Sequence, residues 1–503
     1  MVSIYTSITI PLSIKVFVTY IINTKREFMK TFYWYDYETF GLSPKVQRIA
    51  QFAGIRTDEN LNILEEHMFY CKPTHDCLPA PEACAVTGIT PQLCDKDGLI
   101  EHEFIKKIHH EFSRPETCIV GYNSIAFDDE FTRHTLFRNF IDPYSWHWQN
   151  SNARWDILNV ARFCYAHKEE ESLKWIKNDK NRPIFKLDAL APANNIEHTN
   201  AHDAMADVRA TIGIAAIIKK SQPKLFDYAL SLNDKKEVSR QVHILHPMLL
   251  TNSPFGYKSS FTRLVTAICY HPEYSDRAII FNLNEDPEIL MELEIEELKT
   301  LTFSKKADLP KGIKKLGLNE LVFNKSPMFV CSPNSNSFKL SPPLMEKFQI
   351  NMDNCLKNLQ YIQNNIKKIE EKVQSIYISE GEREPSNDVD QSLYDGFISN
   401  SDRAICNEIQ SLPIDEIERF KPNFEDSRLT KLFLNFKARN YPQLLDEFEQ
   451  EQWFEIVQSR VQNGENGYLS LDSFERSLHK LKESSPERHS LWRDLEKYAQ
   501  SFL

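Results

Sequence analysis

Residues 31–41 read Thr-Phe-Tyr-Trp-Tyr-Asp-Tyr-Glu-Thr-Phe-Gly, and this stretch decides the fold. Its aromatic and β-branched residues predict a buried strand that ends at the glycine. Side chains two residues apart share a strand face, so Asp36 and Glu38 should project together while Tyr37 points away. Adjacent carboxylates repel each other unless a cation lies between them, and a hard divalent metal suits them best. Chance is the competing explanation, because residues 286–288 (Asp-Pro-Glu) repeat the pattern.

Two later segments supply more carboxylates and a histidine. Residues 118–123 (Cys-Ile-Val-Gly-Tyr-Asn) predict a second buried strand, which Phe127, Asp128 and Asp129 follow. Residues 202–207 (His-Asp-Ala-Met-Ala-Asp) lead into an apolar helix. In chain order, the polar set is Asp-x-Glu, Phe-Asp and His-x-x-x-x-Asp.

This order and spacing resembles the DEDD superfamily of 3′–5′ exonucleases, in the branch that carries a histidine. A related branch has a tyrosine three residues before the last aspartate, where this chain has Ala204. The resemblance implies phosphodiester hydrolysis with two Mg²⁺ ions, for which Mn²⁺ can substitute, and with a histidine that takes the water's proton. By this resemblance the metal ligands are Asp36, Glu38, Asp128 and Asp207, and the general base is His202.

Two neighbouring aspartates compete for the same roles. Asp129 adjoins Asp128, and Asp203 adjoins His202. The Phe-Asp pairing favours Asp128, and the four-residue gap after the histidine favours Asp207. A histidine before a helix is more often structural than catalytic, so the catalytic interpretation depends on all three motifs occurring in order.

Alternating elements up to about residue 222 predict an α/β domain with a mixed central sheet, and the resemblance implies the ribonuclease-H-like type. Short β-rich runs with Pro and Asn turns follow, and the end of the chain has helical periodicity. We therefore expect an extension from a mis-assigned start at 1–30 and an exonuclease domain at 31–222. A small β-rich, barrel-like domain at 223–375 and an all-α domain at 376–503 would complete the chain.

Arginines and aromatic residues are interleaved after the second motif. The runs are residues 131–134 (Phe-Thr-Arg-His), 142–148 (Asp-Pro-Tyr-Ser-Trp-His-Trp) and 154–162, which begins Arg-Trp-Asp. Rings that stack on bases contribute about 1–3 kcal/mol each, and guanidinium groups hold phosphates, so the pattern suits a nucleic-acid single strand. The alternative is that the tryptophans of these runs belong to the core: Trp146, Trp148 and Trp155.

With the motif order, these runs make residues 31–503 similar to the bacterial exonuclease I family, which is specific for single-stranded DNA. An Asn-Lys-Ser-Pro run at 324–327 resembles a turn of that family that faces DNA. Lys186 stands where the family leads us to expect arginine; lysine keeps the charge but loses the two-pronged geometry, so we expect weaker substrate holding. By this resemblance the substrate contacts are Glu38, Arg133, Tyr144, Trp148, Arg162, Lys186, Asn324 and Lys325.

The resemblance implies processive hydrolysis of single-stranded DNA from the 3′ end, with release of 5′-mononucleotides, in DNA repair and recombination. It also implies a monomer that binds the C-terminal tail of single-strand-binding protein, for which Tyr228 is the predicted contact. Two alternatives share the catalytic set: an RNA-trimming exonuclease and an inert DNA-binding scaffold. RNA-trimming enzymes are normally far shorter, and a degraded core should have lost one of the five polar residues.

Composition fits this interpretation. The ten cysteines form no CxxC pair, which suits the reducing cytoplasm. A net charge of −11 argues against a surface coated with phosphate-binding groups but permits a local basic channel. The apolar stretch at 8–22 is interrupted by Pro11 and Lys15 and too short for a confident transmembrane helix, so no membrane partner is expected.

Overall fold

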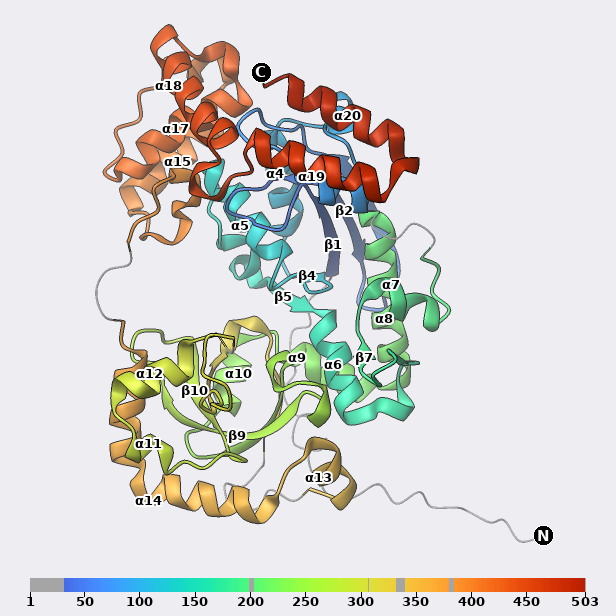
Figure 1. The fold of residues 1–503 in the computed structure, drawn as a ribbon, viewed down its shortest axis with the longest axis vertical. Helices are drawn as coiled ribbons and strands as arrows, with labels where there is room; N and C mark the ends of the chain where they lie inside the picture. Colours follow the sequence, from blue (N-terminus) through green and yellow to red (C-terminus); the bar gives the residue numbers. More distant parts are fainter. Residues whose placement is uncertain (1–30, 199–202, 306, 332–339, 380–383, 503) are drawn as a thin grey trace, which may run out of the picture. The chain divides into compact units, whose positions relative to one another are not determined.

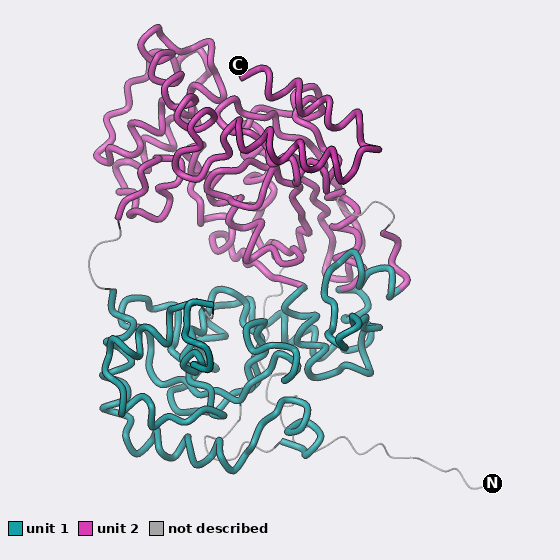
Figure 2. Tube along the Cα trace, viewed as in Figure 1, with its two compact units in different colours: residues 1–28, 158–194, 215–380 teal, residues 29–157, 195–214, 381–503 magenta. Residues whose placement is uncertain are grey.

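The computed structural model describes residues 31–198, 203–305, 307–331, 340–379 and 384–502. The predicted extension at 1–30 and His202 lie outside these ranges. Contacts divide the chain into two compact units, drawn in Figure 2. Within the described ranges, one consists of residues between 158 and 194 and between 215 and 379, and the other of residues between 31 and 157, between 195 and 214 and between 384 and 502. We refer to them as unit 1 and unit 2.

Unit 2 contains the mixed central sheet that the sequence predicts. Its strand order is β3-β2-β1-β4-β5. Strand β1 pairs antiparallel with β2 and parallel with β4, and β4 pairs parallel with β5. The bounds are β1 (Thr31–Thr39), β2 (Ile49–Thr57), β3 (Ile63–Tyr70), β4 (Thr117–Gly121) and β5 (Ala153–Asp156).

Helices α4 (Glu101–Phe112) and α5 (Asp128–Arg138) lie beside this sheet in Figure 1. Alternation along β1 sends its tyrosines into the same apolar core as residues of these two helices. Two short helices, α2 (Pro81–Thr87) and α3 (Pro91–Asp97), precede them, and α8 (Ala204–Ser221) contributes its first part to unit 2.

The C-terminal part of unit 2 is helical, as predicted. Its α-helices are α15 (Asn400–Ser411), α16 (Ile414–Ile417), α17 (Ser427–Asn440), α18 (Glu447–Val457), α19 (Leu471–Ser484) and α20 (His489–Gln500). Leu432 and Phe436 of α17 share a core with Phe137 and Phe140. Helices α19 and α20 share a second core with Phe40 and other residues of the N-terminal part of unit 2. The helices at the end of the chain therefore belong to the same folded body as the central sheet.

A buried cluster of ion pairs joins the two parts of unit 2. Asp76 Oδ2 lies 2.9 Å from Arg48, 3.0 Å from Arg439 and 2.5 Å from Arg460. Asp390 accepts from the same Arg439, and its Oδ2 lies 2.9 Å from Arg460. Each of these five side chains is at most 3% exposed, so their charges are compensated by neighbouring side chains rather than by water, with Asp388 as a third carboxylate 2.7 Å from Arg460.

Unit 1 contains the predicted β-rich region. Five antiparallel strands form a sheet of order β11-β10-β9-β8-β12. The strands are β8 (Pro247–Thr251), β9 (Thr262–Tyr270), β10 (Arg277–Asn282), β11 (Leu318–Val322) and β12 (Met328–Cys331). The long helix α14 (Met352–Tyr377) shares an apolar core with this sheet.

The other helices of unit 1 precede the sheet or flank α14. They are α6 (Ile157–Lys168), α7 (Leu187–Ala193), the second part of α8, α9 (Pro223–Ser231), α10 (Lys235–Gln241), α11 (Ile289–Glu292), α12 (Ile295–Phe303) and α13 (Pro342–Phe348). Strands β6 (Ile176–Lys177) and β7 (Pro183–Ile184) pair antiparallel in a two-stranded ribbon. Within the described ranges, no helix is both long and apolar enough to span a bilayer.

Candidate active site

The candidate site forms where β1 and α8 bring carboxylates together. Asp36 and Glu38 are on β1, opposite Ala53 and Gln51 of β2, and Asp207 lies in the first turn of α8. Ligand oxygens of Asp36, Glu38 and Asp207 all lie within 4.8 Å of one another. Gln51 of β2 joins the sheet to α8, because its Oε1 accepts the backbone N–H of Ala204 at 3.3 Å.

Asp128 is the first residue of α5, only 4% exposed, and it acts on the same cluster. Burial raises the pKa of Asp36 well above its ordinary value, and the charges of Asp128 and Asp207 raise it further. Burial also raises the pKa of Glu38, to about 9, with Asp207 and Asp128 as the next causes. The pKa of Asp128 is raised well above its ordinary value, chiefly by burial and then by Asp129.

This electrostatic arrangement fits a cation. Four carboxylates gathered in a buried site repel one another, and ionisation is favoured when a divalent ion replaces the lost water. Hard oxygen donors of this kind suit Mg²⁺ and Mn²⁺. The residues present therefore fit the metal chemistry that the sequence predicts.

The contacts of the two rival aspartates separate them from the cluster. Asp129 Oδ1 accepts from the Tyr35 hydroxyl at 2.7 Å, and its Oδ2 lies 2.5 Å from Arg154 Nη1. Asp203 Oδ1 accepts the backbone N–H groups of Met205 and Ala206, each at 3.1 Å, and so caps α8. The geometry favours Asp128 and Asp207 as the metal ligands.

One histidine contact was not predicted from the sequence. Because His202 lies outside the described residues, its position relative to the carboxylates stays a prediction. His198 Nε2, by contrast, contacts Asp207 Oδ1 directly. Carboxylates that bind metals are commonly held by a second hydrogen bond of this kind. The motif gives no signal for His198, because the histidine that its four-residue gap separates from Asp207 is His202.

The residues of unit 2 that are predicted to contact a nucleic-acid strand differ in their exposure to solvent. Arg133 is 7% exposed, lies 2.6 Å from Glu130 and stacks over the ring of Tyr144 at 5.6 Å. Trp148 is 60% exposed, which suits a stacking surface. Trp146 and Trp155 are buried, so the core interpretation is correct for these two.

The remaining predicted contacts lie in unit 1, whereas the carboxylates lie in unit 2. Arg162 bonds to Asn159 at 3.0 Å, and Lys186 precedes the first turn of α7. Asn324 donates to Asp276 at 3.2 Å, and Lys325 ends the same short turn. The Tyr228 hydroxyl lies 2.8 Å from the carbonyl oxygen of Phe329, so its polar end is engaged within the unit.

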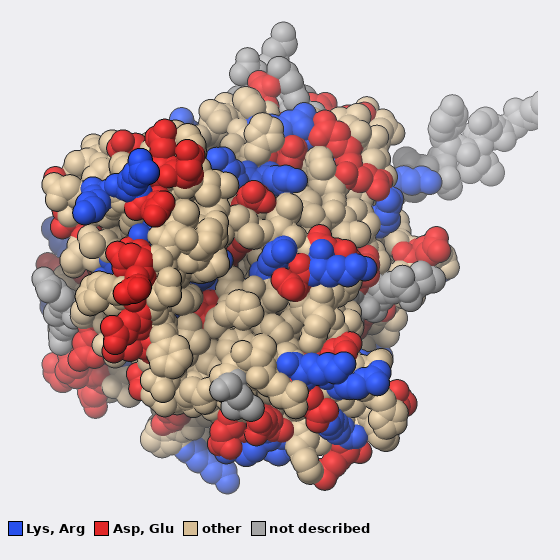
Figure 3. Space-filling view, turned by 90° about the horizontal axis from the view of Figure 1, so that it is seen from above, with Lys and Arg blue, Asp and Glu red and all other residues tan. Residues whose placement is uncertain are grey.

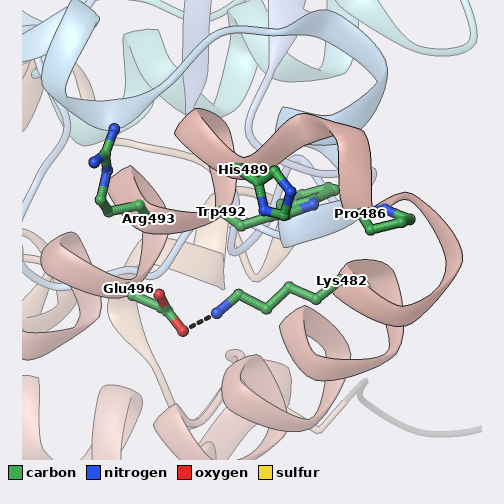
Figure 4. A pocket seen from close by; sticks show the side chains of 6 residues that line it. All are labelled: Lys482, Pro486, His489, Trp492, Arg493 and Glu496. Carbon is green, nitrogen blue, oxygen red and sulfur yellow. Dashed lines mark hydrogen bonds and ion pairs between the residues drawn. The ribbon is translucent and has the colours of Figure 1, made fainter.

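The described residues contain one other group of possible metal ligands, Glu65, His67 and Glu111, which are half-buried and have ligand atoms within 4.8 Å of one another. It lies outside the predicted motifs. On the face drawn in Figure 3, Lys and Arg side chains are interspersed with Asp and Glu rather than gathered in one patch. A hollow between α19 and α20 is shown in Figure 4, where Lys482 pairs with Glu496. Its lining includes none of the predicted site residues.

Comparison with known proteins covers nearly the whole chain. Three family models match in sequence order: Exonuclease over residues 33–215, Exonuclease I SH3-like domain over 233–379, and Exonuclease I C-terminal domain over 387–502. The exodeoxyribonuclease I of Haemophilus influenzae is 38% identical over 480 residues, 94% of this chain and 99% of the relative. That of Escherichia coli is 40% identical over 428 residues, 84% of this chain and 88% of the relative.

Solved structures agree with these relatives. Escherichia coli exonuclease I in complex with a dA16 oligonucleotide has a TM-score of 0.88 at 37% identity, covering 94% of this chain and 100% of the other. A zinc-bound form of that enzyme with single-stranded DNA gives a TM-score of 0.86 at 37% identity, with 94% and 99% covered. A structure of SSB and exonuclease I with the inhibitor CFAM gives 0.84 at 35% identity, with 94% and 100% covered.

Proposed function

The chain belongs to the exodeoxyribonuclease I family, and from this premise we propose how its residues remove nucleotides from the 3′ end of single-stranded DNA. The enzyme is a 3′–5′ exodeoxyribonuclease that requires a divalent metal. The observation that carries the proposal is the carboxylate cluster of Asp36, Glu38 and Asp207, with oxygens within 4.8 Å of one another, in the segment that matches the Exonuclease model.

We assign the metal site to the four clustered carboxylates, with Mg²⁺ as the physiological ion, two ions per site, and Mn²⁺ as a substitute. When bound, the divalent ions activate the attacking water and stabilise the leaving 3′ oxygen. The metal-bearing relative contains zinc, which supports a cation at this fold without identifying the physiological one. The proposed ligands are Asp36, Glu38, Asp128 and Asp207.

The proton of the attacking water goes to His202 in this proposal. An imidazole has an ordinary pKa near the working pH and can accept a proton there. His202 stands five residues before Asp207, at the position that the histidine branch of the superfamily uses. Cleavage then releases a 5′-mononucleotide and leaves a new 3′ hydroxyl, so that the next cycle begins on a strand one nucleotide shorter.

The DNA strand would be held by aromatic rings, of which Trp148 is exposed and Tyr144 half-buried, and by cations. Trp148 and Tyr144 offer rings to bases, and Arg133 offers a charge beside Tyr144. The complete proposed set of substrate contacts is Glu38, Arg133, Tyr144, Trp148, Arg162, Lys186, Asn324 and Lys325. We further propose that the chain has three domains, at 31–222, 223–375 and 376–503, and that the single-stranded DNA contacts them.

Several wider properties follow from family membership as proposals. A relative has been solved with single-strand-binding protein, which supports docking of that protein's C-terminal tail here, with Tyr228 as the proposed contact. We also propose processive digestion, a role in DNA repair and recombination, and a monomeric state. The ten cysteines are thiols, which supports the reducing cytoplasm as the working compartment.

Digestion of 5′-labelled oligonucleotides with Mg²⁺ tests the reaction, comparing single-stranded DNA, duplex DNA and RNA. We expect a ladder that shortens from the 3′ end on single-stranded DNA alone, and its loss in Asp207→Ala. Removing a ligand that acts in catalysis should lower the rate by about 10²-fold or more. Binding without cleavage by the wild type would identify a scaffold, and preferential digestion of RNA would identify an RNA-trimming enzyme.

A further inference from the structure

Two charged side chains of strand β5 contact the start of α5 and the loop before it; the two elements are labelled in Figure 1. Arg154 and Asp156 are two residues apart and therefore share a face of the strand. Asp156 accepts the backbone N–H of Asn123 at 2.9 Å and that of Ile125 at 3.4 Å. The loop before α5 is thus fixed to β5 by a carboxylate that is itself 2% exposed.

Arg154 contacts the next segment of the chain, the first turn of α5. Its Nη1 lies 2.5 Å from Asp129 Oδ2, and the two side chains are 5% and 1% exposed. The other oxygen of Asp129 accepts from the Tyr35 hydroxyl at 2.7 Å. Both carboxylate oxygens of Asp129 are therefore held, one from β5 and one from β1.

The residue fixed in this way is the immediate neighbour of Asp128. A second contact has the same effect. The Tyr37 hydroxyl lies 2.9 Å from Thr132 Oγ1, and the Thr132 hydroxyl donates to the carbonyl oxygen of Asp128 at 3.0 Å. Tyr35 and Tyr37 alternate along β1 with Asp36 and Glu38. The strand that supplies two carboxylates thus also holds the helix that supplies a third.

Holding the first turn of α5 in place matters because Asp128 lies among other carboxylates. Gathered carboxylates repel, and α5 could relieve that repulsion by moving its first turn away from β1. A buried ion pair resists such movement, because breaking it leaves an uncompensated charge in the interior. Functional groups have to be held within about 0.5 Å of their working positions by the shell behind them.

We propose that the buried pair of Arg154 and Asp129, with the Tyr35 hydroxyl, positions Asp128 for metal binding. Arg154 and Asp129 are then positioning residues, not ligands. The inference deepens the proposed function and rests on it. It predicts that metal affinity, measured without DNA, depends on a side chain from β5 that belongs to no catalytic motif.

Arg154→Met tests the proposal through Mn²⁺ binding, followed by electron paramagnetic resonance in the absence of DNA. Loss of such a supporting contact typically costs about 10–100-fold in metal affinity, and we expect the Mn²⁺ dissociation constant to rise by about that factor. Arg154→Lys keeps the charge but loses the planar geometry, and should give an intermediate value.

Arg460→Met is the matched control. Arg460 is similarly buried, in the C-terminal part of unit 2, and its Nη2 lies 2.7 Å from Asp388, which belongs to no group of possible metal ligands among the described residues. It should lower the melting temperature as Arg154→Met does and leave Mn²⁺ affinity unchanged. If both variants lose stability and both keep wild-type Mn²⁺ affinity, the Arg154–Asp129 pair is only structural and the proposal is wrong.

Tyr35→Phe keeps the test decisive if Arg154→Met does not fold. It removes one hydroxyl that donates to Asp129 and leaves the ring in the core. We expect a several-fold rise in the Mn²⁺ dissociation constant, smaller than the 10–100-fold typical of losing a whole supporting side chain; an unchanged value would overturn the proposal. The proposed function fails separately, if the wild type shows no 3′ ladder.

Discussion

At the scale of single residues, the site gathers carboxylates whose mutual repulsion is not relieved by a positively charged side chain among the causes of their pKa shifts. The pKa of Glu38 is raised to about 9, first by burial and then by Asp207 and Asp128. A raised carboxyl pKa means that folding favours the protonated form. The metal-free protein therefore loses stability as the pH rises from the ordinary value of 4.5 toward about 9.

Glu38→Gln should remove part of this repulsion. Without metal, we expect its melting temperature at pH 8 to exceed that of the wild type by about 2–4 °C, the shift that 1 kcal/mol gives in a domain of this size. Activity should be lost at the same time. Thermal scans in EDTA between about pH 5 and 9 measure the difference, with the exposed Glu475→Gln as control. Equal pH dependence in Glu38→Gln and wild type would contradict the prediction.

The candidate ligands could be named from the sequence because each lies in a short motif and the order of the three motifs resembles a known superfamily; their role as ligands stays a prediction. The choice between Asp128 and Asp129 could be argued only from the preceding phenylalanine. Its physical reason, the Arg154 partner of Asp129, lies 25 residues away in the chain. His198 was missed for a similar cause, because its contact with Asp207 depends on how the segment before α8 folds.

At the scale of elements, the last two helices complete a core that begins beside the active site. Phe474 of α19 and Trp492 of α20 belong to the same buried cluster as Phe40, which is two residues beyond Glu38. A hydrogen bond also joins α20 to the exonuclease part, because Gln92 donates to the carbonyl oxygen of Asp494. These helices should therefore contribute directly to the stability of the exonuclease part.

Phe474→Ala should reduce the free energy of unfolding by about 3–5 kcal/mol, the usual cost of deleting a fully buried phenyl ring. Phe454→Ala is the control, because that ring, on α18, is 64% exposed. Its effect should stay within about 0.5 kcal/mol. Urea titration followed by circular dichroism measures both. Similar losses in the two variants would show that burial in this core does not decide stability.

The elements themselves were largely predictable. The mixed sheet, the β-rich region and the helical end follow from hydrophobic period, and family membership and structure confirm them. Barrel-like closure of the β-rich region stays a prediction. The placement of α19 and α20 was not predictable, since an amphipathic pattern shows that a helix buries one face but not against what.

At the scale of the whole molecule, buried charges join segments that are hundreds of residues apart. Burial alone would raise the pKa of Asp390, but Arg439, Arg460 and Arg48 lower it to about 2. The same arginines outweigh burial at Asp76 and lower its pKa well below the ordinary range. A lowered pKa stabilises the fold above the ordinary value of 3.8, and the gain is lost as the pH falls toward 2.

Asp76→Asn should destabilise unit 2 by about 3–5 kcal/mol, because three buried arginines then share fewer negative charges. It should also weaken the acid dependence between about pH 4 and 2. Asp472→Asn, in an exposed pair with Arg476, is the control and should cost at most about 1 kcal/mol. Melting curves across this pH range decide the matter; an acid profile like that of wild type would exclude Asp76 as a source of the dependence.

Nothing local in the sequence marks Arg48, Asp76, Asp390, Arg439 and Arg460 as a group. Each one alone is typical of a solvated surface, and only the packing of the C-terminal helices onto the exonuclease part buries them together. Local patterns therefore predict the parts of this chain better than they predict how parts of unit 2 are joined.

The core around Phe40 is completed by residues of 471–499, which the ribosome makes after every catalytic motif. Domains generally fold from the amino terminus during synthesis, yet here the core of the exonuclease part cannot be completed until these later helices have been made. A chain cut short by a nonsense codon would carry every catalytic motif and still lack the helices that seal its core. Incomplete copies of this nuclease should therefore fall to cellular proteases before they can degrade DNA.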